Sequence, residues 1–328
     1  MQAAYYVKRG TARDVLQVGT VPTPDPRPGE VRVRLQTSGV NPSDVKMRQA
    51  GSPRPMPGDR VIPHSDGAGI VDAIGEGVDV ARVGERVWIW NAGYRRAEGS
   101  AAQYVSLPAA QAVPLPEGVD MAVGACLGIP ALTAWRAVTI DGGVAGRTVL
   151  VSGGAGSVGH YAVQMAKLKG AAQVIATVSS PEKAEVAREA GADETIDYRR
   201  EDVVARVKAL TGGRGVDRIV EVAFDVNVGL LPDALAPHGD VVVYGMGARE
   251  VTIPAGALMQ RNNRLLMILV YELLPADRRA AVEDLTRMLS DDQLIHNVAL
   301  RCPLSEIAAA HEAVERGTLI GNVVLDIA

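Results

Sequence analysis

The segment Arg147–Gly159, with the sequence RTVLVSGGAGSVG, decides the fold. Its apolar run predicts a short buried strand over Thr148–Ser152. A helical pattern that is apolar on one face follows over Gly159–Lys169. A strand, a glycine-rich turn and a helix in this order are typical of a dinucleotide-binding unit.

Three glycines of the turn have the GxGxxG spacing. We expect Gly154 to permit the tight turn, Gly156 to let the backbone approach a pyrophosphate, and Gly159 to let helix and strand pack closely. The start of the helix, with Ser157 and Val158, would then offer backbone N–H groups to the phosphates. The alternative interpretation is a plain tight turn, because glycine turns are common.

The alternation of strand and helix continues beyond this segment. Helices are predicted between the strands, and Pro181–Ala190 opens with Ser180 as its N-cap. Strands that are apolar throughout and alternate with helices predict an α/β fold with a doubly wound parallel sheet. The further predicted strands are Gln173–Val178, Arg218–Val222, Val241–Gly245 and Leu265–Val270, and the tail is predicted as helices Pro275–Ser290 and Leu304–Arg316 and strand Asn322–Ile327.

The first part of the chain, up to about residue 120, has a different sequence pattern. Glycine and proline punctuate short alternating runs, which predict strands at Glu30–Thr37, Gly67–Val71 and Glu85–Trp90. Closely spaced short strands predict a small β-barrel. We therefore expect two domains, one formed by residues 1–122 and 271–328, and a nucleotide-binding domain of residues 123–270 inserted into it.

Composition narrows the range of functions. The chain has 328 residues and a net charge of -4, with 4% aromatic residues, so neither a nucleic acid nor an acidic membrane surface is an expected partner. The N-terminus lacks a signal-peptide pattern, and the longest apolar stretch is too short to span a bilayer. Two isolated cysteines, Cys126 and Cys302, fit a reducing compartment, so a cytoplasmic location is expected.

The end of the second strand predicts which dinucleotide is bound. An NAD-binding fold presents an acidic residue there to the ribose 2′-hydroxyl, but here no acid follows Thr177. Ser179 could instead hydrogen-bond a 2′-phosphate, and Lys183 could pair with it from the next helix. The alternative for Lys183 is an ordinary exposed helix lysine. The missing acid favours NADPH.

Several segments together resemble the zinc-independent quinone oxidoreductases of the medium-chain dehydrogenase/reductase superfamily, the group that includes zeta-crystallin. They are the glycine turn SGGAGSVG and the segments Ser38–Asp44, Leu127–Ala134, His311–Ala313 and Gly321–Val324. The resemblance covers nearly the whole chain. It implies a GroES-like barrel as catalytic domain, a Rossmann domain, a cleft between them, and a homodimer formed by pairing of the last Rossmann strand, Leu265–Val270.

The resemblance also implies roles for individual residues. Asn41 and Asp44 would line the catalytic-domain wall near the nicotinamide, and Thr133 would lie near the ribose and carboxamide. Lys46 stands where many relatives carry Tyr, and could either stabilise negative charge that develops on the substrate oxygen or merely bind phosphate or face solvent. The remaining residues expected near the cofactor are Tyr198, Ala223, Gly245 and Met246.

The zinc ligands of related dehydrogenases have no counterpart here. Their cysteine position is Ser38, and their His-Glu position is Ser65-Asp66. The segment Asn91–Gln103 contains no cysteine, so the cysteine-rich zinc lobe is also missing. Zinc needs about four ligands, and His64 with Asp66 would supply only two. We therefore predict that the protein binds no metal.

The leading interpretation is an NADPH-dependent quinone oxidoreductase that transfers hydride directly, with Asn41, Lys46 and Thr133 at the reacting centre. A quinone can collect its protons from water, so no side chain is expected to be an obligatory acid, base or nucleophile. One alternative is an NADPH-dependent reductase of α,β-unsaturated carbonyls. Another, from a different class, is a non-catalytic, crystallin-like NADPH-binding protein.

Overall fold

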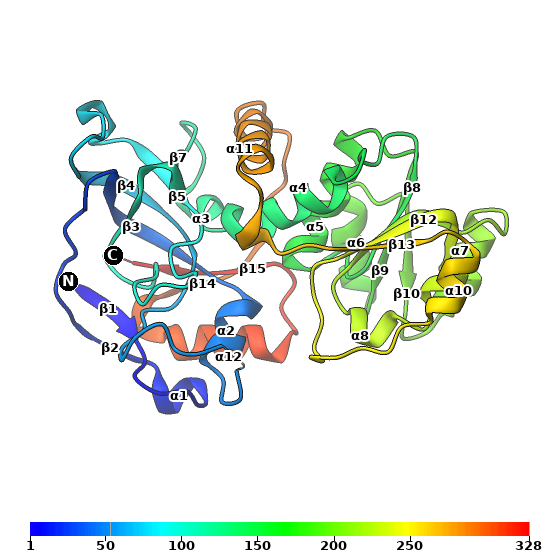
Figure 1. Cartoon of the computed structure of the whole chain (residues 1–328), viewed down its shortest axis with the longest axis horizontal. Helices are drawn as coiled ribbons and strands as arrows, with labels where there is room; N and C mark the ends of the chain where they lie inside the picture. Colours follow the sequence, from blue (N-terminus) through cyan, green and yellow to red (C-terminus); the bar gives the residue numbers. More distant parts are fainter. Residues whose placement is uncertain (53, 328) are drawn as a thin grey trace. The chain divides into compact units, whose positions relative to one another are not determined.

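In the computed structural model, which describes residues 1–52 and 54–327, strand β8 (Thr148–Val151) lies inside a parallel sheet (Figure 1). Among these described residues the strand order is β10–β9–β8–β11–β12–β13, and every neighbouring pair is parallel. This is the order of a doubly wound nucleotide-binding fold, so the predicted α/β class is confirmed. The other strands are β9 (Gln173–Val178), β10 (Glu194–Asp197), β11 (Val216–Glu221), β12 (Leu235–Val243) and β13 (Arg264–Met267).

The observed strands agree with the predicted ones at the centre of the sheet and differ toward both edges. Strand β9 has the predicted bounds, whereas β12 begins six residues earlier than expected, at Leu235 rather than Val241. The predicted strand Leu265–Val270 is wrong at its end, because β13 stops at Met267 and Val270–Glu272 forms a 3₁₀ turn. Strand β10 was not predicted at all.

Helices cover this sheet and follow the predicted pattern. The hydroxyl of Ser180 accepts a hydrogen bond from the Lys183 N–H, which confirms the predicted N-cap. Buried residues such as Ile175, Ile219 and Val241 form the core beneath the helices. The helices of this unit, in chain order, are α4 (Leu132–Thr139), α5 (Ser157–Leu168), α6 (Pro181–Glu189), α7 (Val203–Leu210), α8 (Phe224–Asn227), α9 (Leu231–Ala234) and α10 (Ala255–Gln260).

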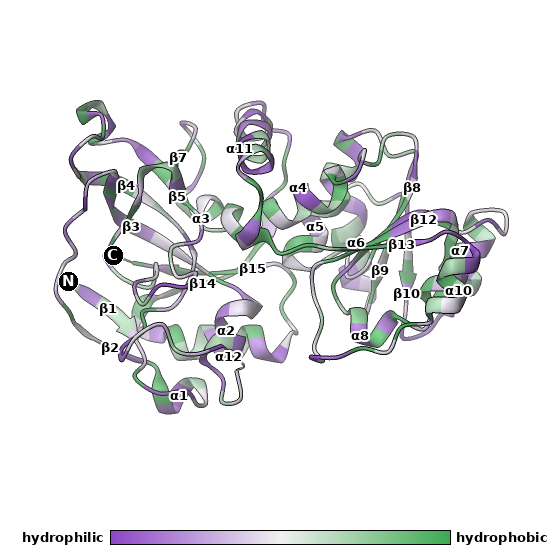
Figure 2. Ribbon diagram, viewed as in Figure 1, coloured by the Kyte–Doolittle hydropathy of each residue, from purple (hydrophilic) through white to green (hydrophobic). Residues whose placement is uncertain are grey.

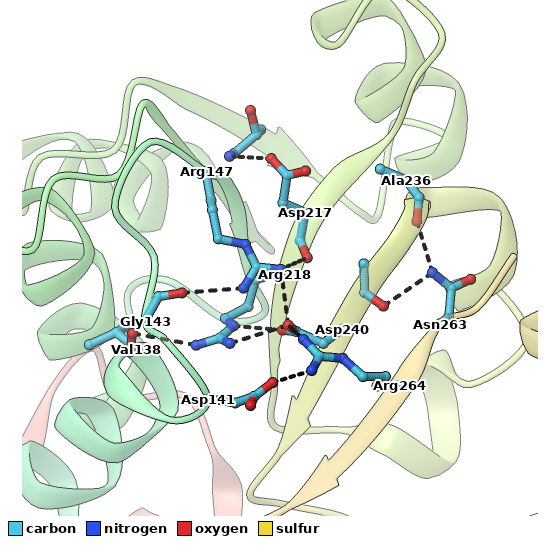
Figure 3. A network of polar contacts seen from close by, with 12 residues as sticks. Val138, Asp141, Gly143, Arg147, Asp217, Arg218, Ala236, Asp240, Asn263 and Arg264 are labelled. Atoms are coloured by element: carbon cyan, nitrogen blue, oxygen red, sulfur yellow. Dashed lines mark hydrogen bonds and ion pairs between the residues drawn. The ribbon is translucent and has the colours of Figure 1, made fainter.

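An ion network joins the strands at one end of this sheet (Figure 3). The carboxylate of Asp240, on β12, accepts hydrogen bonds from Arg218 on β11, from Arg264 on β13 and from Arg147, which precedes β8. Arg218 and Asp240 are both fully buried. One carboxylate thus ties together three neighbouring strands of the sheet.

The other unit contains a mainly antiparallel sheet built around the long strand β3 (Glu30–Val40), in which β14 and β15 form a parallel pair. Within the described residues its strand order is β14–β15–β3–β4–β5–β7, with β6 also paired to β3, and a separate β1–β2 pair. Val33, Val71 and Leu107 belong to the apolar core of this sheet. The bounds are β1 (Gln2–Tyr5), β2 (Gln17–Thr20), β4 (Asp66–Ile74), β5 (Arg86–Ile89), β6 (Tyr104–Pro108), β7 (Ala112–Pro114), β14 (Val298–Pro303) and β15 (Asn322–Asp326).

Helices α2 (Pro42–Arg48) and α12 (Ile307–Arg316) lie side by side in this unit (Figure 1). Hydrophobic and hydrophilic residues alternate along α12 (Figure 2), as expected for a helix with one face on the core. The remaining helices are α1 (Ala12–Val15), α3 (Met121–Gly124) and α11 (Pro275–Ser290). No helix of the described residues combines the length and the apolar sequence that a membrane span requires.

The two compact units divide the chain after Ile129 and after Ala281. Both divisions lie beyond the predicted boundaries at 122/123 and 270/271. The first lies later because α3 packs against β3 and β4 and therefore belongs with the antiparallel sheet. The second falls inside the continuous helix α11.

Candidate functional site

In the glycine turn between β8 and α5, two positions must be glycine because neighbouring protein atoms leave no room for a side chain. A Cβ at Gly154 would lie 2.5 Å from the Cβ of Ala176, and a Cβ at Gly159 would overlap the Gly153 carbonyl oxygen. The left-handed backbone of the turn belongs to Gly153, with φ +69°. Gly154 is therefore needed for close packing on β9 rather than for a left-handed conformation.

Gly156 differs from these glycines because the protein leaves space beside it. Among residues 1–52 and 54–327, and apart from its two chain neighbours, a Cβ there would have one neighbouring atom within 4 Å, the Gly153 carbonyl oxygen at 3.3 Å. Gly156 is also the N-cap of α5, makes no side-chain cap bond, and is followed by no acidic residue in the first turn. The helix dipole therefore favours an anion here, and the turn fits the pyrophosphate of a dinucleotide.

Thr177 supports this turn from the end of β9. Its Oγ1 accepts a hydrogen bond of 3.1 Å from the Gly153 N–H, and its carbonyl accepts one of 3.0 Å from the Gly154 N–H. We expected Thr177 to contact the cofactor itself. The observed bonds give its hydroxyl oxygen a structural role in holding the turn.

The corner expected to bind a 2′-phosphate follows strands β9 and β10. Because these strands are parallel, their carboxyl ends meet at one edge of the sheet. Ser179 is nearly buried, Lys183 is half-buried in the first turn of α6, and Tyr198 is half-exposed with its N–H donated to the Val178 carbonyl. Exposed Arg199 and Arg200 follow Tyr198 directly and add positive charge. This adjacent pair of arginines after a strand was the sequence signal that the prediction missed.

Two acidic residues fix the backbone at the ends of β11 and β12. Buried Glu221 accepts hydrogen bonds from the Ala223 N–H at 2.5 Å and from the Asn227 amide. Asp225 accepts the N–H groups of Gly247 and Ala248, at 2.8 and 3.0 Å. The Asp225 contacts hold the loop that begins with Gly245 and Met246, so both predicted positions lie on a braced loop. Neither acid was predicted.

In the other unit, Asn41 and Asp44 come together where β3 meets α2. Both are buried, and an Asp44 carboxylate oxygen accepts the Asn41 backbone N–H at 2.8 Å. Burial raises the pKa of Asp44 to about 7, although its hydrogen bonds with Asn41 act in the opposite direction. Lys46 lies on the same helix with an exposed side chain. Thr133 is buried on α4, in the unit that carries the nucleotide turn.

Ser38, which stands at the cysteine position of the zinc-dependent relatives, begins a hydrogen-bonded chain of buried polar groups that continues through His64 to His311. The Ser38 hydroxyl lies 2.9 Å from His64 Nδ1, and His64 Nε2 lies 2.9 Å from His311 Nε2. The two rings stack, and burial lowers the pKa of both histidines, that of His311 to about 3. Within residues 1–52 and 54–327, no cluster of three or more His, Cys, Asp and Glu has the arrangement of a metal site.

Both cysteines are buried and unpaired by disulfides. Burial raises the pKa of the Cys126 thiol far above its ordinary value, and burial likewise raises that of Cys302. A nucleophilic cysteine needs a lowered pKa, so neither thiol has the environment of a catalytic nucleophile.

Comparison with known proteins adds independent information. The family model described as alcohol dehydrogenase GroES-like domain matches residues 27–117, and that described as zinc-binding dehydrogenase matches residues 157–287. A quinone oxidoreductase of Pseudomonas aeruginosa is 32% identical over 324 residues, 95% of each chain.

Solved structures resemble the chain over almost its whole length. A protein described as an NAD-dependent alcohol dehydrogenase is 31% identical, with a TM-score of 0.89 and 100% of both chains covered. The quinone oxidoreductase of Escherichia coli, solved in complex with NADPH, is 26% identical with a TM-score of 0.87, and the match covers 99% of this chain and 100% of that one.

Proposed function

Because the chain belongs to the quinone oxidoreductase family of the medium-chain dehydrogenases and reductases, we propose that it reduces quinones with NADPH and without zinc. The observation that carries this proposal is the open side of Gly156 at the uncapped start of α5. When bound there, NADPH supplies the hydride. The acceptor gains that hydride and one proton from water, which yields a hydroquinone.

In this proposal the chain's own residues bind and orient the cofactor and stabilise the charge that develops on the acceptor. The α5 N-terminus holds the pyrophosphate, and Ser179, Lys183 and Tyr198 hold the adenosine phosphate. The loop after β12, braced by Asp225, supports the nicotinamide through Gly245 and Met246. At the reacting centre we place Asn41, Thr133 and Lys46, whose exposed ammonium would stabilise negative charge on the acceptor oxygen.

The test is NADPH oxidation with 1,4-benzoquinone and with a simple enone, before and after exhaustive chelation. We expect faster turnover with the quinone and no loss on chelation. Preference for the enone would favour the reductase of unsaturated carbonyls, and failure with every electrophile would favour a non-catalytic NADPH-binding protein. Activity that chelation abolishes and zinc restores would contradict zinc independence.

Lys183→Ala tests the choice of cofactor. Removing its charge-assisted hydrogen bond to the 2′-phosphate should raise KM for NADPH about 10-fold, the low end of the roughly 1.5–3 kcal/mol typical of such bonds. KM for NADH should change little, because NADH has no 2′-phosphate. Lys167→Ala is the matched control, since Lys167 pairs with Asp193 on the same unit. Equal effects of Lys183→Ala on both cofactors would contradict the proposed NADPH preference.

We also propose a homodimer formed along β13. This strand is the last in the described sheet order, and its other long edge has no strand partner within residues 1–52 and 54–327. Met267 at the end of β13 and Leu269 just after it are 56% and 43% exposed, and a second copy would cover these apolar side chains. Sedimentation velocity should show a dimer at micromolar concentration, and a monomer there would contradict the proposal.

The location that suits this chemistry is the cytoplasm. Cys126 and Cys302 are free and buried, as in proteins of a reducing compartment. We propose a cytoplasmic location on that basis.

A further inference from the structure

Asp66, the first residue of β4, is fully buried and joins two segments that are distant in the sequence. One carboxylate oxygen, Oδ2, accepts a hydrogen bond of 2.8 Å from the Asn41 side-chain amide and one of 3.0 Å from the Ile129 N–H. We propose that Asp66 is a positioning residue, which orients the Asn41 carboxamide for the reaction. This inference rests on the proposed function, in which Asn41 lies at the reacting centre.

The hydrogen bonds leave Asn41 little freedom. Its backbone N–H is bound by Asp44 at 2.8 Å, and its side-chain nitrogen is bound by Asp66. A carboxylate accepts from N–H but cannot donate, so the amide nitrogen must face Asp66 and the amide oxygen must face away. In a buried place water does not compete for this hydrogen bond, so the orientation is firmly held.

The second contact of Asp66 fixes a segment of irregular backbone. Ile129 belongs to the π-helical turn Leu127–Ala131, and such turns disturb the regular helical bonds and occur often at functional sites. Gly128 lies so close that a Cβ there would overlap Asp66 Oδ1. The turn is shaped around the carboxylate, and in the chain it leads directly into α4, which begins at Leu132 and carries Thr133.

Placing a carboxylate at this buried position is energetically unfavourable in itself. Burying a charge is unfavourable unless hydrogen bonds compensate, and here two N–H groups converge on a single oxygen. The Ser100 hydroxyl also donates to the Asp66 carbonyl at 2.5 Å, so the backbone beneath the carboxylate is held as well. Hydrogen bonds from Asn41, Ile129 and Ser100 thus fix the position of Asp66. Its carboxylate is therefore a fixed acceptor for the Asn41 amide.

The test is a double-mutant cycle of Asp66→Ala and Asn41→Ala, measured as NADPH-dependent quinone turnover. Asp66→Ala should lower kcat about 100-fold, as expected when a reacting group is misplaced, and should leave the NADPH Kd nearly unchanged. In the Asn41→Ala background it should cost less than about 3-fold, because no carboxamide remains to be oriented. Asp66→Asn should restore turnover to within about 10-fold of wild type, since its amide oxygen can accept both N–H groups.

Thr37→Val is the matched control, because it removes a different hydrogen bond of the same unit, the part-buried one that Thr37 Oγ1 donates to the Met121 carbonyl, and should leave kcat unchanged. Losses that multiply in the double variant would overturn the proposal. If Asp66→Ala fails to fold, Asp66→Leu replaces it in the cycle, because leucine fills a similar volume and cannot accept a hydrogen bond, and losses that multiply there would overturn the proposal equally.

A second measurement needs no activity. The Asn41 side-chain amide should exchange its hydrogens slowly by NMR in the wild type and in Asp66→Asn, and rapidly in Asp66→Ala. Unchanged exchange in Asp66→Ala would refute the positioning role. Absence of quinone turnover in the wild type would count against the proposed function alone, because the exchange result would still report on Asp66.

Discussion

Gly156→Val is expected to weaken NADPH binding at least ~100-fold while the protein stays folded, because the side chain would occupy the place of the pyrophosphate. Gly156 has φ -79° and ψ 170°, an extended backbone that valine adopts without strain. Apart from its chain neighbours, the described part of the chain brings one atom within 4 Å of the new Cβ, the Gly153 carbonyl oxygen at 3.3 Å, so the added atoms point into open space.

Gly159→Val is the control that separates binding from folding. A Cβ at Gly159 overlaps the Gly153 backbone, so this variant should lower the unfolding temperature as well as binding. NADPH binding is measured by fluorescence titration, and folding by circular dichroism during heating. Near-normal NADPH affinity in Gly156→Val would contradict the placement of the pyrophosphate at the α5 N-terminus.

The regular part of the fold was predictable because its signals are local. Strand β9 and the Ser180 cap follow from a run of apolar residues and from capping chemistry within a few positions. Strand β10, with the sequence ETID, escaped prediction because it is short and has one apolar residue, Ile196. Strand β12 begins before its apolar run, at Leu235, since pairing with β11 outweighs the unfavourable propensity of the proline and glycine within it.

The candidate functional residues were predictable only where they belong to a sequence motif or to a segment that resembles a known family. The glycine turn lies within one short segment, so spacing alone indicated an anion site. The bond between Asn41 and Asp66 joins residues 25 positions apart, and that between Asp66 and Ile129 spans 63. Contacts of this kind depend on which strands pair and in which register, and no local periodicity reports them. For the same reason the sequence does not report the bond from the Gly153 N–H to Thr177 Oγ1, which joins residues 24 positions apart.

Asp240→Asn is expected to lower the free energy of unfolding by about 3–5 kcal/mol, as is typical when one partner of a buried ion pair is removed. Arg218 Nε lies 2.6 Å from one carboxylate oxygen of Asp240, and Arg147 and Arg264 each lie 2.9 Å from the other (Figure 3). The substitution keeps the shape of the side chain but removes the charge that three guanidinium groups share.

Most of this loss should come from Arg218. Arg147 and Arg264 have side chains that are 22% and 46% exposed, so water can solvate them when the carboxylate is gone. Arg218 is fully buried, and its remaining contacts are the Ala137 and Val138 carbonyls at 3.4 Å. A buried guanidinium without a counter-charge is strongly destabilising, and this one lies between strands of the sheet.

The pH dependence of the effect has a definite sign. Burial alone would raise the pKa of Asp240, but the hydrogen bond and charge of Arg218, together with Arg147, hold it below its ordinary value of 3.8. A carboxyl group with a lowered pKa stabilises the folded state above its unfolded pKa and loses that contribution as the pH falls through the folded value. The difference between wild type and Asp240→Asn should therefore be constant from neutral pH to about pH 5 and shrink in stronger acid.

Urea unfolding of the two proteins, followed by circular dichroism, measures this difference. Glu185→Gln is the control, because its ion pair with Arg188 is exposed and should contribute less than about 1 kcal/mol. A loss of less than about 1 kcal/mol in Asp240→Asn would mean that the three arginines find other partners or water at little cost, and that backbone pairing and hydrophobic packing hold these strands together without the ion network.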